Sequence, residues 1–322
     1  MWWLFPHVRA WMERAREHQT SQMKILPAWV RRRTIDFCRV NFAASAVRRR
    51  DPLPHHGHPV SLHMVLSRDG LLMGQLALRS LEFHSGFSWA PVLHDDGTLS
   101  DRDVAELRSN FPDAVVIRRT EADAALGEAL ASYPQCRENR LKHPWFLKVF
   151  DTRHYATHDR YIVLDSDIVF FRRPDFVLDW MGKRPETFWF MEDTREKYSS
   201  DRAGIEAAMG FPLWERVNSG LDLMVRPAVD LALAEKFLER CAPIAREFHF
   251  LEQTFFAVAG SVWGKGGKLP REYEISWTNF RRPGAVCRHY VGPFKNDALF
   301  IEGASVFWWQ SRRVLRSRVE KN

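Results

Sequence analysis

The chain has 322 residues, of which 45% are hydrophobic and 27% charged, so it can bury one large core or two smaller ones. It lacks a run of 18 uncharged apolar residues, which argues against a membrane-spanning helix, and charges interrupt the apolar start before a secretory signal could form. Its four scattered cysteines form neither a metal-binding CxxC pair nor a disulfide framework. We therefore expect a globular, cytoplasmic protein.

The formal net charge of +7 comes from the first 57 residues, which hold 11 Lys/Arg and 4 Asp/Glu, while the remaining 265 hold 36 of each. The runs Arg31–Arg33 and Arg48–Arg50 could attract anionic lipid, giving peripheral membrane contact, or nucleic acid; a solvated helical extension is the alternative. The neutral body argues against nucleic acid as the main substrate. We predict a basic helical N-terminal extension and linker over residues 1–57, followed by one domain over 58–322.

From residue 60 onward, strand-like and helical segments alternate. The sequence predicts strands at 60–67, 89–95, 113–119 and 160–167, and helices at 70–84, 99–111, 121–133 and 143–155. Ser100 with Asp103, and Thr120 with Asp123, predict the caps of two of these helices. In the second half, strands are expected at 186–193 and 217–227, and helices at 227–241 and 248–260. This alternation predicts an α/β fold with a mostly parallel, Rossmann-like sheet flanked by helices.

Two aspartates, Asp165 and Asp167, end the apolar strand "RYIVLDSD". The pleat of a strand directs them the same way, with Ser166 opposite, and open α/β sheets bind ligands at this edge. Two carboxylates that point together suit Mg²⁺ or Mn²⁺ shared with a substrate diphosphate, because an ionised carboxylate in apolar surroundings requires a compensating cation. A solvated Asp-Ser-Asp turn is the alternative interpretation.

A second motif, His289, Gly292 and Lys295, has the spacing H-x-x-G-x-x-K. Histidine can supply a third, neutral metal ligand. Glycine lets the backbone approach a phosphate closely, and lysine supplies a mobile positive charge for it. Together with the two aspartates, this motif favours a metal–diphosphate site.

These motifs together resemble the GT-A glycosyltransferases, most closely glycosyltransferase family 8, which includes glycogenin and bacterial lipopolysaccharide galactosyltransferases. The similarity covers roughly residues 60–305. It implies that Asp165, Asp167 and His289 hold Mn²⁺ (or Mg²⁺) on a UDP-sugar or other nucleotide-sugar donor. The resemblance further implies transfer of a hexose to a glycan, lipid or protein acceptor, with retention of configuration.

The resemblance also assigns roles to other residues by their place in the motifs. Lys148, Gly292 and Lys295 are implied to bind the donor, and the "NSG" segment to line the sugar site. The family's Asp-Gln pair appears here as Glu252 and Gln253. The resemblance implies that Gln253 and Asn218 are the catalytic residues. It implies that Ser219, Gly220 and Glu252 bind the substrate. The sequence departs from the family in lacking Pro-Trp after Lys295 and a Thr-Asp-x-x-Tyr-like stretch after the first strand.

Two other classes of protein stay open at this point. "DSDIV" fits the D-x-D-x-T/V motif of haloacid-dehalogenase-type phosphohydrolases, in which Asp165 would be the nucleophile and Asp167 a general acid. That motif normally sits on the first strand, whereas here three strand–helix units come first. The other alternative is a non-catalytic nucleotide-sugar-binding module. A nucleotidyltransferase is disfavoured because its opening Gly-rich phosphate loop is missing.

Overall fold

The computed structural model describes residues 28–48, 53–183, 186–275, 281–292 and 294–319. The predictions for residues 1–27, and for Arg49 and Arg50 in the second arginine run, lie outside the described residues. Within the described ranges, no helix combines the length and the apolar character that crossing a bilayer requires. The four cysteines are free and buried.

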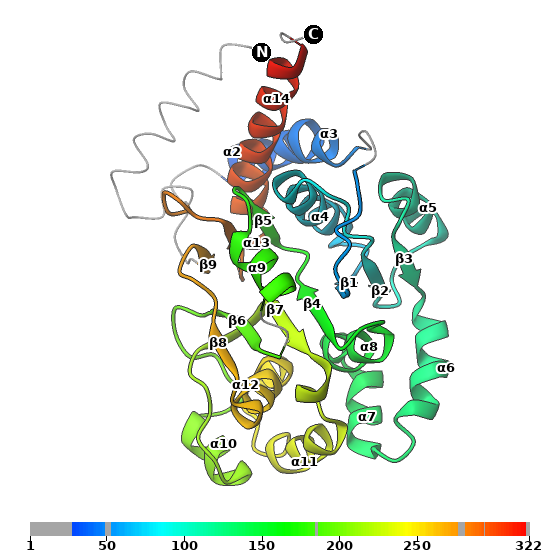
Figure 1. The fold of residues 1–322 in the computed structure, drawn as a ribbon, viewed down its shortest axis with the longest axis vertical. Helices are drawn as coiled ribbons and strands as arrows, with labels where there is room; N and C mark the ends of the chain where they lie inside the picture. Colours follow the sequence, from blue (N-terminus) through cyan, green and yellow to red (C-terminus); the bar gives the residue numbers. More distant parts are fainter. Residues whose placement is uncertain (1–27, 49–52, 184–185, 276–280, 293, 320–322) are drawn as a thin grey trace.

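The main sheet has seven strands among the described residues, in the order β3-β2-β1-β4-β7-β6-β8 (Figure 1). β1 to β4 are parallel, β7 is antiparallel to its neighbours β4 and β6, and β8 is parallel to β6. The mostly parallel α/β sheet predicted from the sequence is therefore confirmed. The strands are β1 Val60–Leu66, β2 Val92–Asp95, β3 Val115–Ile117, β4 Arg160–Leu164, β6 Phe188–Glu192, β7 Val217–Val225 and β8 Gly266–Lys268.

The central strand β4 contributes to a core on each face of this sheet. Tyr161 and Val163 pack on one face, and Ile162 and Leu164 on the other, so the strand is a nearly continuous apolar run, as expected when both faces are covered. The first face is covered by α6 Arg119–Ala129, α7 Pro134–Lys142, α8 Leu147–Tyr155, α10 Arg202–Met209, α11 Leu231–Cys241 and α12 Leu251–Trp263. The second face is covered by α4 Leu71–Ser85, α5 Asp101–Asn110 and α9 Asp175–Lys183.

A small second sheet brings the C-terminal part of the chain back to the end of β4. Its strands, in the order β5-β10-β9, are β5 Ile168–Phe170, β10 Cys287–His289 and β9 Tyr273–Ile275. In the antiparallel register of β10 and β5, His289 lies opposite Ile168. This pairing places His289 beside Asp167, although the two residues are 122 positions apart in the sequence.

Both ends of the described chain pack together in a third core (Figure 1). Cys38, Phe42 and Val47 are buried there against α4, β5 and Tyr290. The N-terminal elements are α2 Ala28–Cys38, a π-helix Arg39–Ala43 and α3 Ala44–Val47; the C-terminal ones are α13 Phe294–Ala298, a π-helix Leu299–Ala304 and α14 Ser305–Val319. Residues 28–47 are thus helical, and they share a core with elements of the predicted second domain. The domain boundary at residue 57 stays a prediction.

Local predictions in the first half are mostly confirmed, with two corrections. Ser100 and Asp103 form the predicted capping box. Thr120 does not cap the next helix, which begins at Arg119, because Asp123 pairs instead with Arg119 and Arg140. Helix α7 was not predicted because its sequence, PQCRENRLK, lacks an apolar stripe, although a proline at the first position is a common helix start. The predicted helix at 143–155 begins with a short 3₁₀ turn, Pro144–Phe146.

Candidate metal and donor site

The turn that carries the two aspartates is fixed between the two sheets. The Asp165 N–H donates to the carbonyl of Gly220 in β7 at 2.7 Å, and the Asp167 carbonyl accepts from the N–H of Tyr290 at 3.0 Å. The turn lies at the carboxyl end of β4, where the strand order changes direction between β1 and β4. Open α/β sheets bind ligands at this point.

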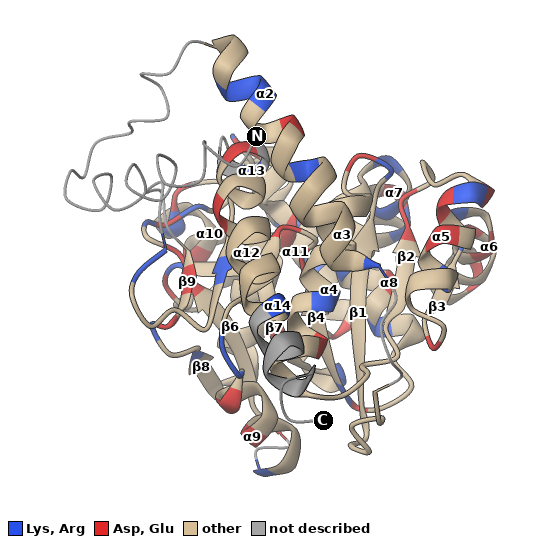
Figure 2. Cartoon of the chain, turned by 90° about the horizontal axis from the view of Figure 1, so that it is seen from above, with Lys and Arg blue, Asp and Glu red and all other residues tan. Residues whose placement is uncertain are grey.

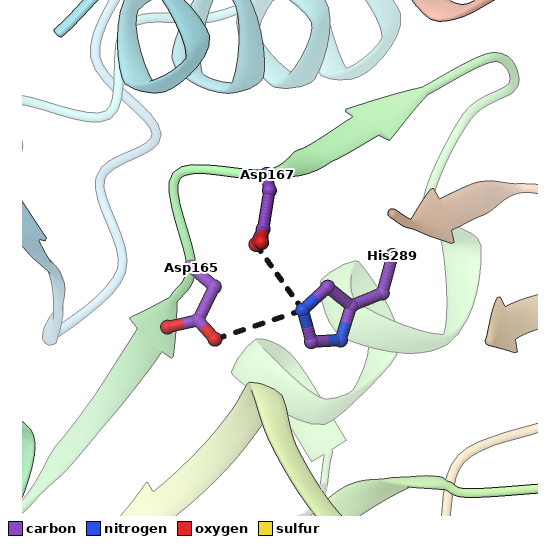
Figure 3. A group of neighbouring side chains, drawn as sticks. All are labelled: Asp165, Asp167 and His289. Carbon is purple, nitrogen blue, oxygen red and sulfur yellow. Dashed lines mark ion pairs between the residues drawn. The ribbon is translucent and has the colours of Figure 1, made fainter. Parts of the chain in front are cut away.

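His289 and the two aspartates form one compact group (Figure 3). One potential ligand atom from each residue can be chosen so that all three lie within 4.8 Å of one another. His289 Nε2 is 3.1 Å from Asp167 Oδ1 and 3.7 Å from Asp165 Oδ2. Among the described residues, no other group of three or more His, Cys, Asp or Glu side chains is arranged in this way.

Hydrogen bonds around Asn218 define which nitrogen of His289 is available to a metal. The Asn218 amide nitrogen donates to Asp193 and Gln253, and its Oδ1 accepts from the N–H of Gly220. Because this oxygen only accepts, His289 Nδ1, at 2.9 Å, must carry the proton. In the neutral ring, Nε2 then directs a lone pair at the two carboxylates, the arrangement that a metal-ligating histidine needs.

The buried carboxylate of Asp167 also fits a cation. Its Oδ1 is buried and has no well-formed hydrogen bond among the described residues. Burial alone would raise the pKa of Asp167, but the positive charges that face it, a cationic imidazole at His289 and the ammonium of Lys295, outweigh burial and lower that pKa. A metal ion on Nε2 would supply this charge in place of the imidazole proton. Asp167 is therefore held as a carboxylate with one oxygen open to a ligand. Oxygen and imidazole donors of this kind suit Mn²⁺ or Mg²⁺.

Gly220 is required by the close approach of the histidine ring to β7. A Cβ at this position would lie 2.3 Å from His289 Nδ1 and 2.6 Å from Cε1. Any side chain would push the ring away from Asn218 and from the aspartates. The glycine of the "NSG" segment thus has a steric role in placing the candidate metal ligand.

Two lysines contact the aspartates, one lysine to each. Lys295 Nζ, half-buried, is 3.1 Å from Asp167 Oδ2. Lys148 Nζ, from α8, is 2.9 Å from Asp165 Oδ1 and 3.1 Å from Glu252 Oε1. Burial would lower the pKa of Lys148, but the carboxylates of Asp165 and Glu252 outweigh burial and raise it, so the lysine is a permanent cation. Each aspartate of the turn is therefore paired with a positive charge.

The start of α12 and the "NSG" segment of β7 form the wall beside the metal ligands. Gln253 Oε1 accepts from the amide nitrogen of Asn218 at 3.2 Å, and its Nε2 donates to the carbonyl of Lys197 at 2.6 Å. Ser219 Oγ donates to Glu252 Oε2 at 3.1 Å, and burial raises the pKa of Glu252. The side chains of this wall are held by hydrogen bonds to one another, and their orientations are fixed.

The structure thus gathers at one edge of the sheet almost all of the site residues named from the sequence. Gly292 lies farther out, in the exposed turn after β10, with a φ of 55° that favours glycine. Sequence reasoning missed Asp193 and Asp222, both buried near the site. Asp193 follows the last residue of β6 and accepts a hydrogen bond from the amide nitrogen of Asn218. An acidic residue at the end of a predicted strand was the sequence signal that could have identified it. Asp222 lies within β7, and burial raises its pKa well above the ordinary value.

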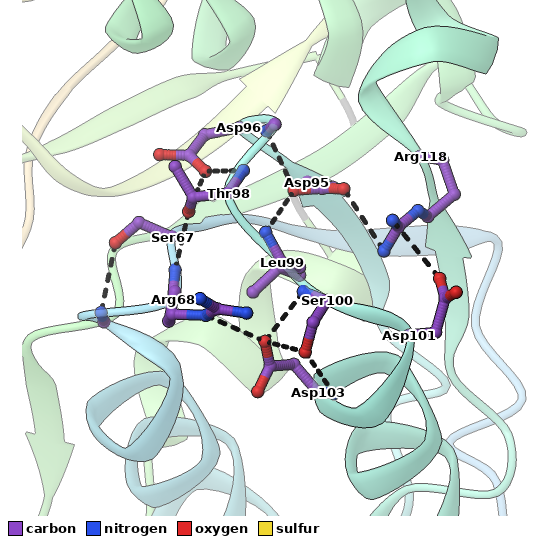
Figure 4. A network of polar contacts seen from close by, with 12 residues as sticks. Ser67, Arg68, Asp95, Asp96, Thr98, Leu99, Ser100, Asp101, Asp103 and Arg118 are labelled. Carbon is purple, nitrogen blue, oxygen red and sulfur yellow. Dashed lines mark hydrogen bonds and ion pairs between the residues drawn. The ribbon is translucent and has the colours of Figure 1, made fainter.

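A polar network occupies the carboxyl ends of β1 to β3 (Figure 4). The backbone N–H of Arg68 donates to Thr98 Oγ1 at 2.8 Å, and the exposed guanidinium of Arg68 donates from Nε to Asp103 Oδ2. Asp95 accepts from the N–H groups of Gly97 and Leu99. These contacts order the loops that follow β1 and β2, where the expected Thr-Asp-x-x-Tyr-like stretch is missing.

Comparison with known proteins gives likenesses of structure only. No family model matches the chain, and no curated protein matches it. The galactosyltransferase LgtC, solved with donor and acceptor sugar analogues, is 15% identical over 79% of this chain and 95% of its own, with a TM-score of 0.53. An active-site mutant of LgtC gives 14% identity, the same coverage and a TM-score of 0.52. Mouse xyloside xylosyltransferase 1 is 12% identical over 71% of this chain and 97% of its own, with a TM-score of 0.48.

The likeness to LgtC shows that this chain has the GT-A fold.

Proposed function

We propose that this protein is a metal-dependent glycosyltransferase, which transfers a hexose from a nucleotide-diphosphate sugar, foremost a UDP-sugar, to a glycan, lipid or protein acceptor with retention. The observation that carries the proposal is the Asp165, Asp167 and His289 group at the point of the sheet where the strand order changes direction. Peripheral membrane contact through the basic N-terminal residues and a cytoplasmic location belong to the same proposal.

Asp165, Asp167 and His289 would hold Mn²⁺ or Mg²⁺. When bound, the cation supplies Lewis-acid stabilisation to the diphosphate of the donor. The chain adds its own positive charge at the same place. Lys295, whose Nζ is 3.1 Å from Asp167 Oδ2, would stabilise the negative charge that grows on the diphosphate as the sugar leaves. Lys148 holds Asp165 and Glu252 in fixed positions. The preorganised charges would stabilise departure of the nucleoside diphosphate.

The transfer itself exchanges one bond at the anomeric carbon. The bond from this carbon to the diphosphate oxygen breaks, the acceptor oxygen forms a new bond on the same face, and the acceptor proton passes to the departing diphosphate. Gln253 and Asn218 would line the opposite face, where Gln253 Oε1 offers a neutral oxygen to the developing positive charge. The mutual hydrogen bonds of these two amides fix that oxygen before substrate binds.

The test is turnover by the wild-type protein. With Mn²⁺ and a panel of UDP-hexoses, we expect slow hydrolysis to UDP and a free sugar, stimulation by simple glycoside acceptors, and NMR evidence that the product keeps the anomeric configuration of the donor. An inverted product would overturn the retaining mechanism. Release of inorganic phosphate from p-nitrophenyl phosphate without UDP-sugar turnover would indicate the phosphohydrolase, and Mn²⁺-dependent donor binding without any turnover would indicate the non-catalytic module.

A further inference from the structure

His289 has two fully buried neighbours in the sequence, Arg288 and Tyr290. Side chains alternate along an extended chain, so both lie on the opposite side of β10 from the His289 ring. Arg288 Nη1 donates to Glu302 Oε2 at 2.8 Å, and the hydroxyl of Tyr290 donates to the same oxygen at 3.0 Å. One carboxylate therefore holds both neighbours of a candidate metal ligand.

The other oxygen of Glu302 fixes the loop that leads into β10. Glu302 Oε1 accepts from the backbone N–H of Arg281 at 2.7 Å. The Glu302 side chain is buried, and each of its oxygens accepts a hydrogen bond from the chain. Unlike Asp167, Glu302 is therefore not itself available to a metal, and any effect that it has on the site must pass through the residues it binds.

Tyr290 connects Glu302 to the turn that carries the aspartates. Its backbone N–H donates to the carbonyl of Asp167 at 3.0 Å, and the guanidinium of Arg288 lies 4.7 Å from the centroid of its ring. A displacement of Tyr290 would consequently move His289 and Asp167 relative to each other.

Residues from both ends of the described chain hold Glu302 in place. It lies in the π-helix Leu299–Ala304, whose Phe300 packs in the third core with Phe42 of the N-terminal segment. The guanidinium of Arg39 lies 5.0 Å from the centroid of the Phe300 ring. Figure 2, which looks onto this end of the molecule, shows α3 beside α4 and α14. The position of Glu302 therefore depends on the packing of the terminal segments.

We propose that Glu302 is a positioning residue of the candidate metal site, which fixes the backbone on both sides of His289. This inference rests on the proposed function, because it concerns the same metal ligand. A metal ligand has to lie within about 0.5 Å of its productive position, and hydrogen-bonded supporting residues supply that precision. Asn218 orients the ring of His289, whereas Glu302 holds the chain that carries the ring.

The experiment measures binding of Mn²⁺ alone to the full chain by electron paramagnetic resonance, at a temperature where the variants are folded. Glu302→Gln keeps the volume of the side chain but removes its charge, and it should weaken Mn²⁺ binding by about tenfold or more, the scale of losing a residue that supports a metal ligand. The matched control is Glu82→Gln, because Glu82 is also buried and accepts from the guanidinium of Arg79 at 2.7 Å. This control should lose stability and still bind Mn²⁺ as the wild type does.

A measurement without metal separates this inference from the proposed function. The ring-nitrogen NMR resonances of His289, assigned with His289→Gln, should move in Glu302→Gln and stay in place in Glu82→Gln. If the wild type bound no Mn²⁺, the proposed metal-dependent function would fail, and these resonances alone would decide whether Glu302 positions His289.

Tyr290→Phe decides the question if Glu302→Gln does not fold. It removes one hydrogen bond to Glu302 and leaves the bond from Arg288, so both effects should appear in the same direction and be smaller. Three results would overturn the proposal: a folded Glu302→Gln with wild-type Mn²⁺ affinity and unmoved resonances, an equal loss of affinity in Glu82→Gln, or an unfolded Glu302→Gln together with a Tyr290→Phe that matches the wild type in both measurements.

Discussion

Two clusters of buried charge in this protein differ in how completely their members are paired. Arg140, almost fully buried, makes two hydrogen bonds to Asp151, at 2.7 and 2.8 Å, and a third to Asp123. Both oxygens of Asp151 are thereby paired, and the cluster ties α6, α7 and α8 together. At the candidate metal site, by contrast, Asp167 Oδ1 is buried beside a histidine nitrogen and has no well-formed hydrogen bond to any residue that the structure describes.

The difference indicates what each cluster is for. A closed cluster, with every charge paired inside the chain, contributes to holding helices in place. An open cluster leaves ligand atoms for something outside the chain. Removing one member should therefore cost stability in the first cluster and binding in the second.

The largest effect is expected for Asp167→Asn, which removes a charged ligand without changing volume. Binding of a UDP-sugar in the presence of Mn²⁺, followed by calorimetry, should be lost, while the thermal unfolding midpoint should stay close to that of the wild type. The control is Asp175→Asn, at an exposed position at the start of α9. Wild-type affinity in Asp167→Asn would show that the open cluster is not a metal site.

In the closed cluster, Asp151→Asn should lower the free energy of unfolding by about 3–5 kcal/mol, because it leaves Arg140 buried without its bidentate partner. Urea denaturation measures this effect. At temperatures where the variant is folded, Mn²⁺-dependent donor binding should be retained. A stable variant that has lost donor binding would remove the distinction between the two clusters.

Lys295→Ala tests whether the open cluster acts on the transition state. Since the charge of the diphosphate grows as the sugar leaves, the loss of this lysine should lower kcat by roughly 10²-fold. The donor Kd should rise less than that. Steady-state kinetics and equilibrium binding, measured on the same preparation, separate the two quantities. An equal change in both would mean that Lys295 only holds the donor in its ground state.

The smallest effect concerns a neutral buried pair, His63 and His94, whose rings are stacked with a 3.0 Å contact between nitrogens. Burial lowers the pKa of His94 to about 3. The unfolded chain binds a proton near pH 6.5, so between pH 6.5 and 3 the unfolded state holds more protons. Stability should therefore fall as pH falls, by up to about 1.4 kcal/mol per pH unit for this histidine.

Urea denaturation at pH 7.5 and 5.5 measures that slope. His94→Gln should flatten it, whereas His249→Gln, at an exposed position, should leave it unchanged. An unchanged slope in His94→Gln would assign the acid sensitivity to other groups.

The sheet was predictable from the sequence because the alternation of strands and helices is a local signal. Of the candidate site residues, Asp165, Asp167, His289, Gly292 and Lys295 were named from local motifs, whereas the others were named through the family resemblance. The alternation of apolar strands and amphipathic helices predicted a mostly parallel sheet, and a pair of aspartates after an apolar strand placed the candidate site at its carboxyl edge. Where the local signal was weak the prediction failed: α7 has no apolar stripe, and Asp123 is drawn from its predicted cap by Arg140, which reaches it from another helix.

How those residues meet depends on contacts between distant parts of the chain, which appear only once it is folded. His289 reaches Asp167 because β10 pairs with β5. Its Nε2 faces the aspartates because Asn218, held by Asp193 and Gln253, accepts a hydrogen bond from Nδ1–H. The same holds for the N-terminal segment. Its charge was visible in the sequence, but its burial against α4, β5 and α14 was not, because contacts between distant segments depend on packing surfaces that no local pattern records.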